Sequence, residues 1–213
     1  MSTPASSLAS HGVTYAQEIA EAARDHGLDP ALLAAVAAQE TGGPDTNAGR
    51  NEIGDGGHGH GLFQIDDRYH RFATTAAVMN PKSNAEYAAG MLSGLISRYG
   101  SVRRALNAYN AGDPNARGTT TRWADGQVLG YADSVMRHYA RIAGVAASPD
   151  DAARDDLPTA VSSITSLASC AASLPPLSTP QAAHVRSYRD VAGLDNRGQL
   201  RDESGDDTSD DDV

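Results

Sequence analysis

The stretch DPALLAAVAAQETGG, residues 29–43, combines a nearly unbroken apolar pattern with one carboxylate close to its end. Asp29 followed by Pro30 is typical of a helix start, because proline fits the first helical position. Two glycines close the pattern, as they often do at the end of a helix. Leu33 and Val36 fall on one face at helical spacing, so the stretch predicts a short helix that turns this face toward a core.

Glu40 continues the stripe formed by Leu33 and Val36, and it is therefore expected on the same side of the helix. A charge on that side is costly unless it is paired, and the negative end of the helix dipole also disfavours an ionised carboxylate. Both effects raise the pKa of the side chain, which suits a general acid that works near neutral pH. From this helix alone, the alternative is a glutamate at a frayed end that turns to water.

Helix patterns recur on both sides of this stretch. Thr14 begins TYAQ, in which its hydroxyl is expected to cap a helix, and SNAE at residues 83–86 is a second capping box. Apolar residues follow each start at helical spacing. The expected helices span residues 14–26, about 83–99 and 102–109, and a segment before Gly144 that carries Tyr131, Val135, Tyr139 and Ile142.

Between residues 42 and 80 glycines are frequent and no long periodic pattern occurs, which predicts loop with at most short strands around LFQI, residues 62–65. Alanine is abundant and only 5% of the residues are aromatic, which favours close packing of helices with small side chains. The fold class is therefore mainly α, of the α+β kind, with a helical bundle and a small β or loop lobe.

The net charge of −10 is unevenly placed. Residues 1–145 hold 12 Lys and Arg against 14 Asp and Glu, whereas residues 146–213 hold 5 against 13. Neither part offers a basic face, which argues against nucleic acid as a partner. We expect a flexible N-terminus over residues 1–11, a folded domain over 12–145, and an acidic, largely disordered tail over 146–213 that is a candidate docking segment for a protein partner.

The sequence has no pattern typical of a signal peptide, a membrane-spanning segment or an internal disulfide. The first residues lack the basic and apolar parts of a signal peptide, and no run of about 18 apolar residues occurs. Cys170 is the only cysteine of the sequence, which excludes an internal disulfide. We therefore expect a soluble monomer without a Sec signal and without a membrane partner.

The stretch GHGHGLFQIDDRYH, residues 57–70, is rich in both glycine and ionisable side chains. It fits three kinds of structure: a metal site, a flexible loop, or the floor of a pocket for a polar polymer. Its histidines lack the helical spacing that metal sites commonly use, so we expect no metal. Glycine permits close approach of the backbone to a ligand or a neighbouring helix, which favours the pocket floor.

Five motifs in this order resemble the goose-type lysozymes, within the lysozyme and soluble lytic transglycosylase superfamily. The resemblance covers roughly residues 12–143, and a single motif such as GLFQ would be weak by itself. It implies a lysozyme-like fold in which the helical domain and the small lobe enclose a sugar-binding cleft. The motifs are ET at residues 40–41, GD at 54–55, GHGHGLFQIDDRYH at 57–70, AYNAG at 108–112 and YADSV at 131–135.

The resemblance also implies roles for individual residues. Glu40 corresponds to the acid that protonates the glycosidic oxygen between N-acetylmuramic acid and N-acetylglucosamine. Asp55 and Asp66 correspond to the aspartates that position and activate a water on the opposite sugar face. No cofactor is implied. The expected sugar contacts are His60, Gln64, His70, Tyr109, Asn110 and Tyr131.

The carboxylates decide between two chemistries of the superfamily. An inverting glycosidase needs a base about 6.5–9.5 Å from its acid to leave room for water. Lytic transglycosylases lack a carboxylate opposite the acid, and the muramyl 6-hydroxyl attacks instead. Because Asp55 and Asp66 are both present, we favour inverting hydrolysis, with transglycosylation and an inactive structural module of a phage tail or injection machine as alternatives. Without a Sec signal, delivery to the wall by lysis, a phage particle or an injection machine is expected.

Several other polar residues have two interpretations. Asp45 and Glu52, in the segment before GlyAspGly, are alternatives to Asp55 as the second acid. Trp123 fits either stacking on a sugar or filling the core. The residues expected as solvated surface are Asp67, Arg68 and Arg103.

Overall fold

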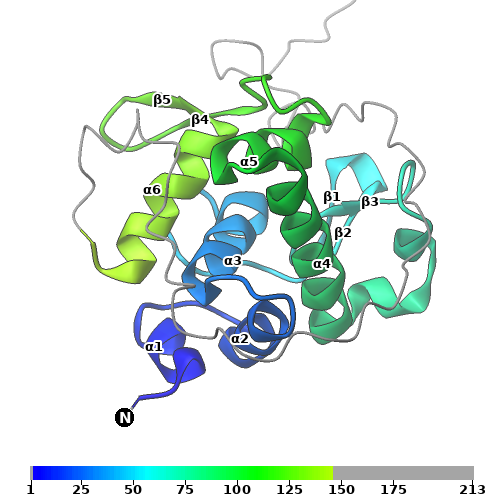
Figure 1. Cartoon of the computed structure of the whole chain (residues 1–213), viewed down its shortest axis with the longest axis horizontal. Helices are drawn as coiled ribbons and strands as arrows, with labels where there is room; N and C mark the ends of the chain where they lie inside the picture. Colours follow the sequence, from blue (N-terminus) through cyan, green and yellow to red (C-terminus); the bar gives the residue numbers. More distant parts are fainter. Residues whose placement is uncertain (1, 146–213) are drawn as a thin grey trace, which may run out of the picture.

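The computed structural model describes residues 2–145, and the predicted tail over 146–213, with Cys170, lies outside them. The described chain is mainly helical with two small antiparallel sheets, which confirms the predicted fold class (Figure 1). Its elements are α1 (Pro4–Ser10), α2 (Ala16–Asp25), α3 (Pro30–Ala37), β1 (Ile53–Gly54), β2 (Gly59–His60), β3 (Ile65–Asp66), α4 (Pro81–Tyr99), α5 (Val102–Ala111), β4 (Thr120–Arg122), β5 (Val128–Gly130) and α6 (Tyr131–Ala143).

Helix α3 lies in the middle of the helical body and packs against α2 and α6 (Figure 1). Every residue from Ala31 to Ala37 is buried, which agrees with the apolar pattern of this stretch. The Asp29 carboxylate accepts a hydrogen bond from the Ala31 amide at 2.8 Å, so the predicted helix start is confirmed. Alanines on α3 permit close approach of its neighbours, and the helix that leads to Glu40 is held on all sides.

The starts of two other helices differ from the prediction. The Thr14 hydroxyl does not cap α2; it donates to the Gly49 carbonyl at 2.5 Å, while Tyr15 at the cap position has a left-handed backbone. Helix α4 begins two residues before SNAE, because Asn80 caps it by accepting from the Ser83 amide. The expected cap of α2 is thus lost to a partner 35 residues away, and that of α4 is replaced by a residue three positions earlier.

The first eleven residues were expected to be flexible, but most of them form α1. Thr3 caps this helix by accepting from the Ser6 amide, and Pro4 occupies its first turn. Leu8 is buried against the core. A single apolar anchor and a good cap are thus enough to order a segment whose composition is otherwise polar and small.

Strands β1, β2 and β3 form a small antiparallel lobe, with Gly59 opposite Asp66 in the register of β2 and β3. Asn84 of α4, which is fully buried, ties this lobe to the helical body. Its amide nitrogen donates to the carbonyls of His60 and Val78, and its oxygen accepts from the Phe63 amide at 2.9 Å. Polar bonds from one side chain therefore set the position of the lobe.

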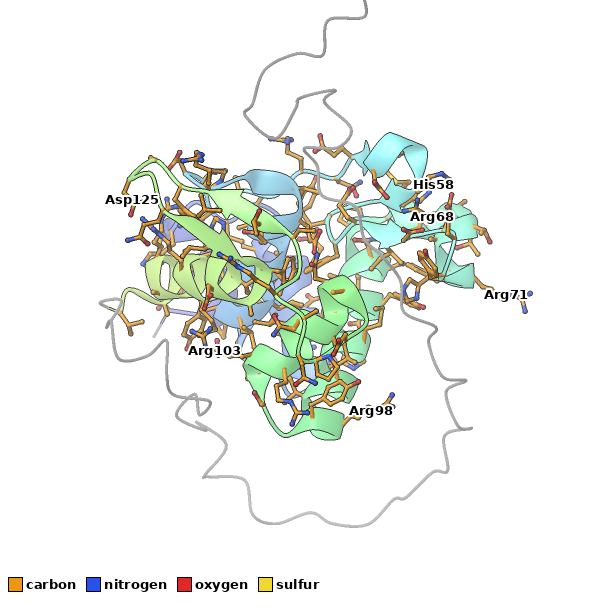
Figure 2. The ribbon with its side chains drawn as sticks, turned by 90° about the horizontal axis from the view of Figure 1, so that it is seen from above. His58, Arg68, Arg71, Arg98, Arg103 and Asp125 are labelled. Atoms are coloured by element: carbon orange, nitrogen blue, oxygen red, sulfur yellow. The ribbon has the colours of Figure 1, made fainter. Side chains whose placement is uncertain are left out.

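Strands β4 and β5 form a hairpin that packs on α6, apart from the lobe in both views (Figures 1 and 2). Trp123 at the end of β4 is buried and donates through Nε1 to the Ser134 hydroxyl of α6 at 3.3 Å. The Arg137 guanidinium lies over its ring, 4.3 Å from the ring centre. Trp123 therefore fills the core beneath the hairpin, which answers the question that the sequence left open.

Candidate active site

A cavity of about 270 Å³ opens between the β1–β3 lobe, the end of α3 and the β4–β5 hairpin. Glu40, Asp55 and Asp66 all line it, although 26 positions separate the first from the last. The hairpin side of the cavity is formed by the backbone and side chains of residues 119–122. The three carboxylates that the sequence predicted as a group are thus brought to one solvent-filled space.

Glu40 lies on a π-helical turn, Ala38–Gly42, which continues α3. The Gly43 amide donates to the Ala38 carbonyl at 3.0 Å, five residues back, so this turn is wider than an α-helical one. The buried Thr41 side chain fixes the turn to the lobe, because its hydroxyl lies 3.1 Å from the Leu62 carbonyl and accepts from the Arg50 amide. Turns of this kind are frequent at functional sites.

Burial raises the pKa of Glu40 to about 7, although the residue is only partly covered. The Tyr131 hydroxyl of α6 donates to Glu40 Oε1 at 2.5 Å, and this bond acts in the opposite direction by favouring the ionised form. Tyr131 is itself buried, with its ring stacked near that of Tyr109. Glu40 therefore carries its proton to near-neutral pH and is held in one orientation.

Asp55 and Asp66 face the same cavity from the lobe, and Arg68 bridges them. The Arg68 guanidinium donates to both carboxyl groups, and its backbone amide donates to Asp66 Oδ1 at 2.8 Å. Asp66 is buried, whereas the Asp55 side chain keeps 13% of its surface exposed. The lobe thus presents two carboxylates with one cation behind them.

The family model of the transglycosylase SLT domain matches residues 17–125, just over half of the chain. The chain belongs to this family. It is a peptidoglycan-degrading enzyme of the lytic transglycosylase and lysozyme-like kind. No curated protein matches the chain. The matched range includes the three carboxylates but ends before Tyr131, so the hydroxyl that orients Glu40 comes from beyond it.

Among the expected sugar contacts of this SLT domain, Gln64, Asn110 and Tyr131 line the cavity. The Gln64 backbone is left-handed, and its side chain crosses β1 and β2 so closely that a Cβ on Gly59 would lie 2.4 Å from Gln64 Oε1. The buried Asn110 does not cap α5; its Oδ1 accepts from the Thr119 amide at 2.8 Å and holds the segment before β4. These residues therefore shape the cavity as well as face it.

The other three expected contacts are not among the residues that line the cavity. His60 Nε2 lies 3.1 Å from Asp67 Oδ2, and His70 Nδ1 lies 3.0 Å from the Tyr87 hydroxyl. Tyr109 donates to the Phe63 carbonyl at 3.2 Å, beneath the lobe. Their hydrogen bonds hold the lobe together and attach it to the body, so the placement favours supporting roles for these three.

The predicted solvated surface is incomplete for three residues. Arg68 is exposed as predicted, but it also pairs with two cavity carboxylates, and the half-buried Arg103 pairs with Asp133 on α6. Asp67 accepts from the side chains of both His58 and His60, which lowers its pKa. Each of these charges has a partner that the expectation of simple solvation did not include.

The acids proposed as substitutes for Asp55 lie elsewhere. The Glu52 carboxylate is bound by both Nε and a terminal nitrogen of Arg50, and neither Glu52 nor Asp45 lines the cavity. Within residues 2–145, no group of three His, Cys, Asp or Glu side chains is placed to hold a metal ion. The same residues contain no helix that is long and apolar enough to cross a membrane.

The hairpin side of the cavity was not predicted from the sequence. Gln39, next to the predicted acid, donates to the Thr121 hydroxyl at 2.9 Å and so links the π-helical turn to β4. The run of threonines at 119–121 and the following Arg122 line the cavity together. These residues stand out in the sequence as the polar run TTTR, residues 119–122, directly before Trp123. Nothing in that local pattern indicates which residues of the chain the run will face.

Proposed function

We propose that this enzyme cleaves the β-1,4 bond between N-acetylmuramic acid and N-acetylglucosamine by inverting hydrolysis. Glu40 acts as the general acid, and the lobe carboxylates Asp55 and Asp66 position and activate the water. The observation that carries the proposal is the shared cavity, in which Glu40, with a pKa that burial raises to about 7, faces two aspartates paired with an arginine. An inverting glycosidase needs an acid on one side of the sugar and a carboxylate that binds the water on the other.

In the proposed reaction the bond from the muramyl anomeric carbon to the glycosidic oxygen breaks as Glu40 gives its proton to that oxygen. A water molecule on the opposite sugar face forms the new bond to the anomeric carbon and gives a proton to the aspartate side. The product carries a reducing muramyl end. Gln64, Asn110 and Tyr131 are the proposed sugar contacts, because they line the same cavity.

Lytic transglycosylation is the second candidate, and the family description favours it. In that reaction the muramyl 6-hydroxyl replaces water as the nucleophile, and the product is a 1,6-anhydro end. The pairing of Asp66 also favours this chemistry, because both of its oxygens accept from Arg68 and fewer carboxylate oxygens are left to bind a water. Glu40 has the same role in both reactions, so the two candidates differ only in the nucleophile.

An inactive structural module is the least supported reading, since the enzyme family is shown and the predicted acid faces the cavity with its proton retained. The proposal is tested by digesting insoluble peptidoglycan with the protein and with Glu40→Gln. We expect the substitution to reduce the release of muropeptides at least about 10³-fold, because it removes the proton donor. Glu18→Gln on α2, away from the cavity, is the matched control and is expected to keep full activity.

Mass spectrometry of the released fragments separates the two chemistries. Reducing muramyl ends support hydrolysis, and ends lighter by one water support transglycosylation. A Glu40→Gln variant that keeps its rate would contradict both, because each depends on the same acid.

A further inference from the structure

The two lobe carboxylates are held very unequally. Asp66 Oδ1 accepts from the Arg68 amide at 2.8 Å and from Arg68 Nε at 3.0 Å, and its Oδ2 accepts from a terminal guanidinium nitrogen at 2.5 Å. The residue is 4% exposed. Both of its oxygens are therefore occupied by one neighbour, two positions along the chain.

Asp55 is bound to Arg68 through only one of its two carboxylate oxygens. Its Oδ2 accepts from the Arg68 guanidinium, whereas no residue in the described part of the chain donates a hydrogen bond to its Oδ1. The Asp55 backbone is left-handed, with φ of 47°, in the glycine-rich turn that follows β1. One oxygen of this cavity-lining carboxylate is thus restrained, while the other has no donor among the described residues.

Arg68 lies behind the two carboxylates and is not among the residues that line the cavity. Figure 2 places it in the β1–β3 lobe, the part of the molecule that also carries His58. Two carboxylates held side by side repel one another unless a cation lies between them. The Arg68 guanidinium provides that cation without itself facing the substrate space.

We propose that Arg68 is a positioning residue that makes the two aspartates unequal: it immobilises Asp66 as an anchor and leaves Asp55 Oδ1 as the oxygen that takes the proton from the attacking water. This inference rests on the proposed function, because it assigns the base of the hydrolytic reaction. In the step itself, the water oxygen bonds to the anomeric carbon, one water proton passes to Asp55 Oδ1, and the Glu40 proton leaves with the glycosidic oxygen.

The first test replaces each aspartate by alanine and adds sodium azide, a small anion that attacks without needing a base. With a soluble muropeptide oligomer as substrate, azide bonds to the anomeric carbon while Glu40 protonates the leaving oxygen. We expect Asp55→Ala to lose about 10³-fold in kcat and to recover at least tenfold with azide, giving a glycosyl azide of inverted configuration. Asp66→Ala is expected to lose activity without recovery, since its anchor is gone.

Recovery of Asp66→Ala, equal recovery of both variants, or recovery of neither would overturn the inference. These outcomes are separate from failure of the proposed function, which shows in the protein without substitutions. If that protein forms only anhydro ends, or if Glu40→Gln stays active, the hydrolytic proposal fails. If it forms reducing ends through Glu40 and the aspartate variants behave otherwise than expected, only the inference about Arg68 fails.

The second test substitutes the arginine itself. Arg68→Gln is expected to lower kcat about 100-fold with KM changed less than threefold, because the aspartates lose the group that positions them while the proposed sugar contacts stay in place. Arg68→Lys keeps the charge and is expected to lose much less of kcat than Arg68→Gln. It also carries the test if Arg68→Gln folds poorly.

Arg71→Gln is the matched control, because this arginine lies three positions away on the same lobe and extends into solvent (Figure 2). It is expected to keep the kcat and the KM of the parent enzyme. An unchanged kcat in Arg68→Gln, a rise of KM as large as the loss of kcat, or the same kcat loss in both arginine variants would show that Arg68 does not position the aspartates.

Discussion

The helical body around α3 and the β1–β3 lobe present opposite faces of one cavity, and they are held together by a different balance of forces. The body buries Leu33, Val36 and the alanines of α3, so apolar packing fixes the acid side. The lobe has strands of two residues each; Leu62, Phe63 and Ile65 anchor it in the same core, and hydrogen bonds from buried or half-buried polar side chains hold the rest of it. The acid is thus carried by a region of apolar packing, and the aspartates by a region that depends more on polar bonds.

This difference indicates where each region is vulnerable. A packed apolar region loses stability gradually as atoms are removed, whereas a polar network loses it abruptly when one buried partner is left without its hydrogen bonds. The lobe should therefore detach from the site while the body stays folded. The variants below separate the two regions, from the largest expected effect to the smallest.

Asn84→Ala should have the largest effect on stability. It removes a buried side chain that bonds to Phe63, His60 and Val78, and it leaves their backbone groups without partners. Since each unsatisfied buried group costs about 1–3 kcal/mol, we expect a loss of about 3 kcal/mol. Urea unfolding measures the loss, and hydrogen exchange should show the Phe63 amide unprotected while amides of α3 stay protected.

Asn115→Ala, at an exposed position after α5, is the control for this comparison and should change stability by less than about 0.5 kcal/mol. Equal loss of protection in α3 and in the lobe after Asn84→Ala would mean that the two regions unfold as one unit. The body and the lobe would then differ in their amino-acid composition but not in how they unfold.

Gly49→Ala tests the contact between the two regions. A Cβ at this position would lie 2.7 Å from Leu62 Cδ1 on the lobe side and 2.9 Å from the Ala37 carbonyl of α3. The Ala37 carbonyl cannot move without shifting α3, and the buried Leu62 side chain would have to repack, so we expect destabilisation of about 2 kcal/mol and a lower kcat. Gly94→Ala, where an added Cβ meets nothing, is the control and should not lower stability. A fully stable Gly49→Ala would show that the contact is looser than its distances indicate.

The two regions also differed in how much the sequence could predict. Helical periodicity placed Leu33, Val36 and Glu40 on one face, because spacing along a single helix is a local property. It did not predict the π-helical turn at Ala38–Gly42, which depends on Thr41 reaching Leu62 across the lobe. Packing of the body follows from its own pattern, whereas the turn is set by a partner from another segment.

The lobe was predicted only as glycine-rich loop with short strands, and its polar partners were mostly missed. Arg68 was predicted as solvated surface and is exposed, but its bridge between Asp55 and Asp66 was not predicted. Asn84 was noticed only as part of a capping pattern. The sequence shows that a buried polar side chain needs hydrogen-bond partners, but which residues become its partners depends on the tertiary structure.

The buried His138 is expected to make the stability of the helical body depend on pH. Both of its ring nitrogens are buried without a hydrogen-bond partner among the described residues, and burial lowers its pKa to about 3. The unfolded chain therefore takes up a proton first as the pH falls below the ordinary value near 6.5, and stability decreases from there toward pH 3. At pH 5.5 this amounts to about 1.4 kcal/mol.

His138→Leu should remove this acid-dependent loss while retaining an apolar contact with Trp123. Thermal unfolding at pH 7.5 and pH 5.5 measures the difference, with His11→Gln at an exposed position as the control that keeps the parent dependence. An equal loss between the two pH values in His138→Leu and in the parent would place the acid sensitivity in another residue.

Tyr131→Phe should have the smallest effect, and it compares the two regions within the site. Its hydroxyl donates to Glu40 from the body, whereas the neighbouring hydroxyl of Tyr109 donates to the Phe63 carbonyl beneath the lobe. Because the Tyr131 bond favours ionised Glu40, its removal raises the pKa of Glu40 further above its ordinary value. The alkaline limb of kcat/KM, near pH 7 in the parent, should move to higher pH, with a loss of activity below about tenfold at pH 6. Tyr109→Phe should leave the alkaline limb of kcat/KM in place, since the acid depends on the body for its proton. An alkaline limb that moves in Tyr109→Phe and stays in Tyr131→Phe would show that contacts to the lobe set the pKa of Glu40.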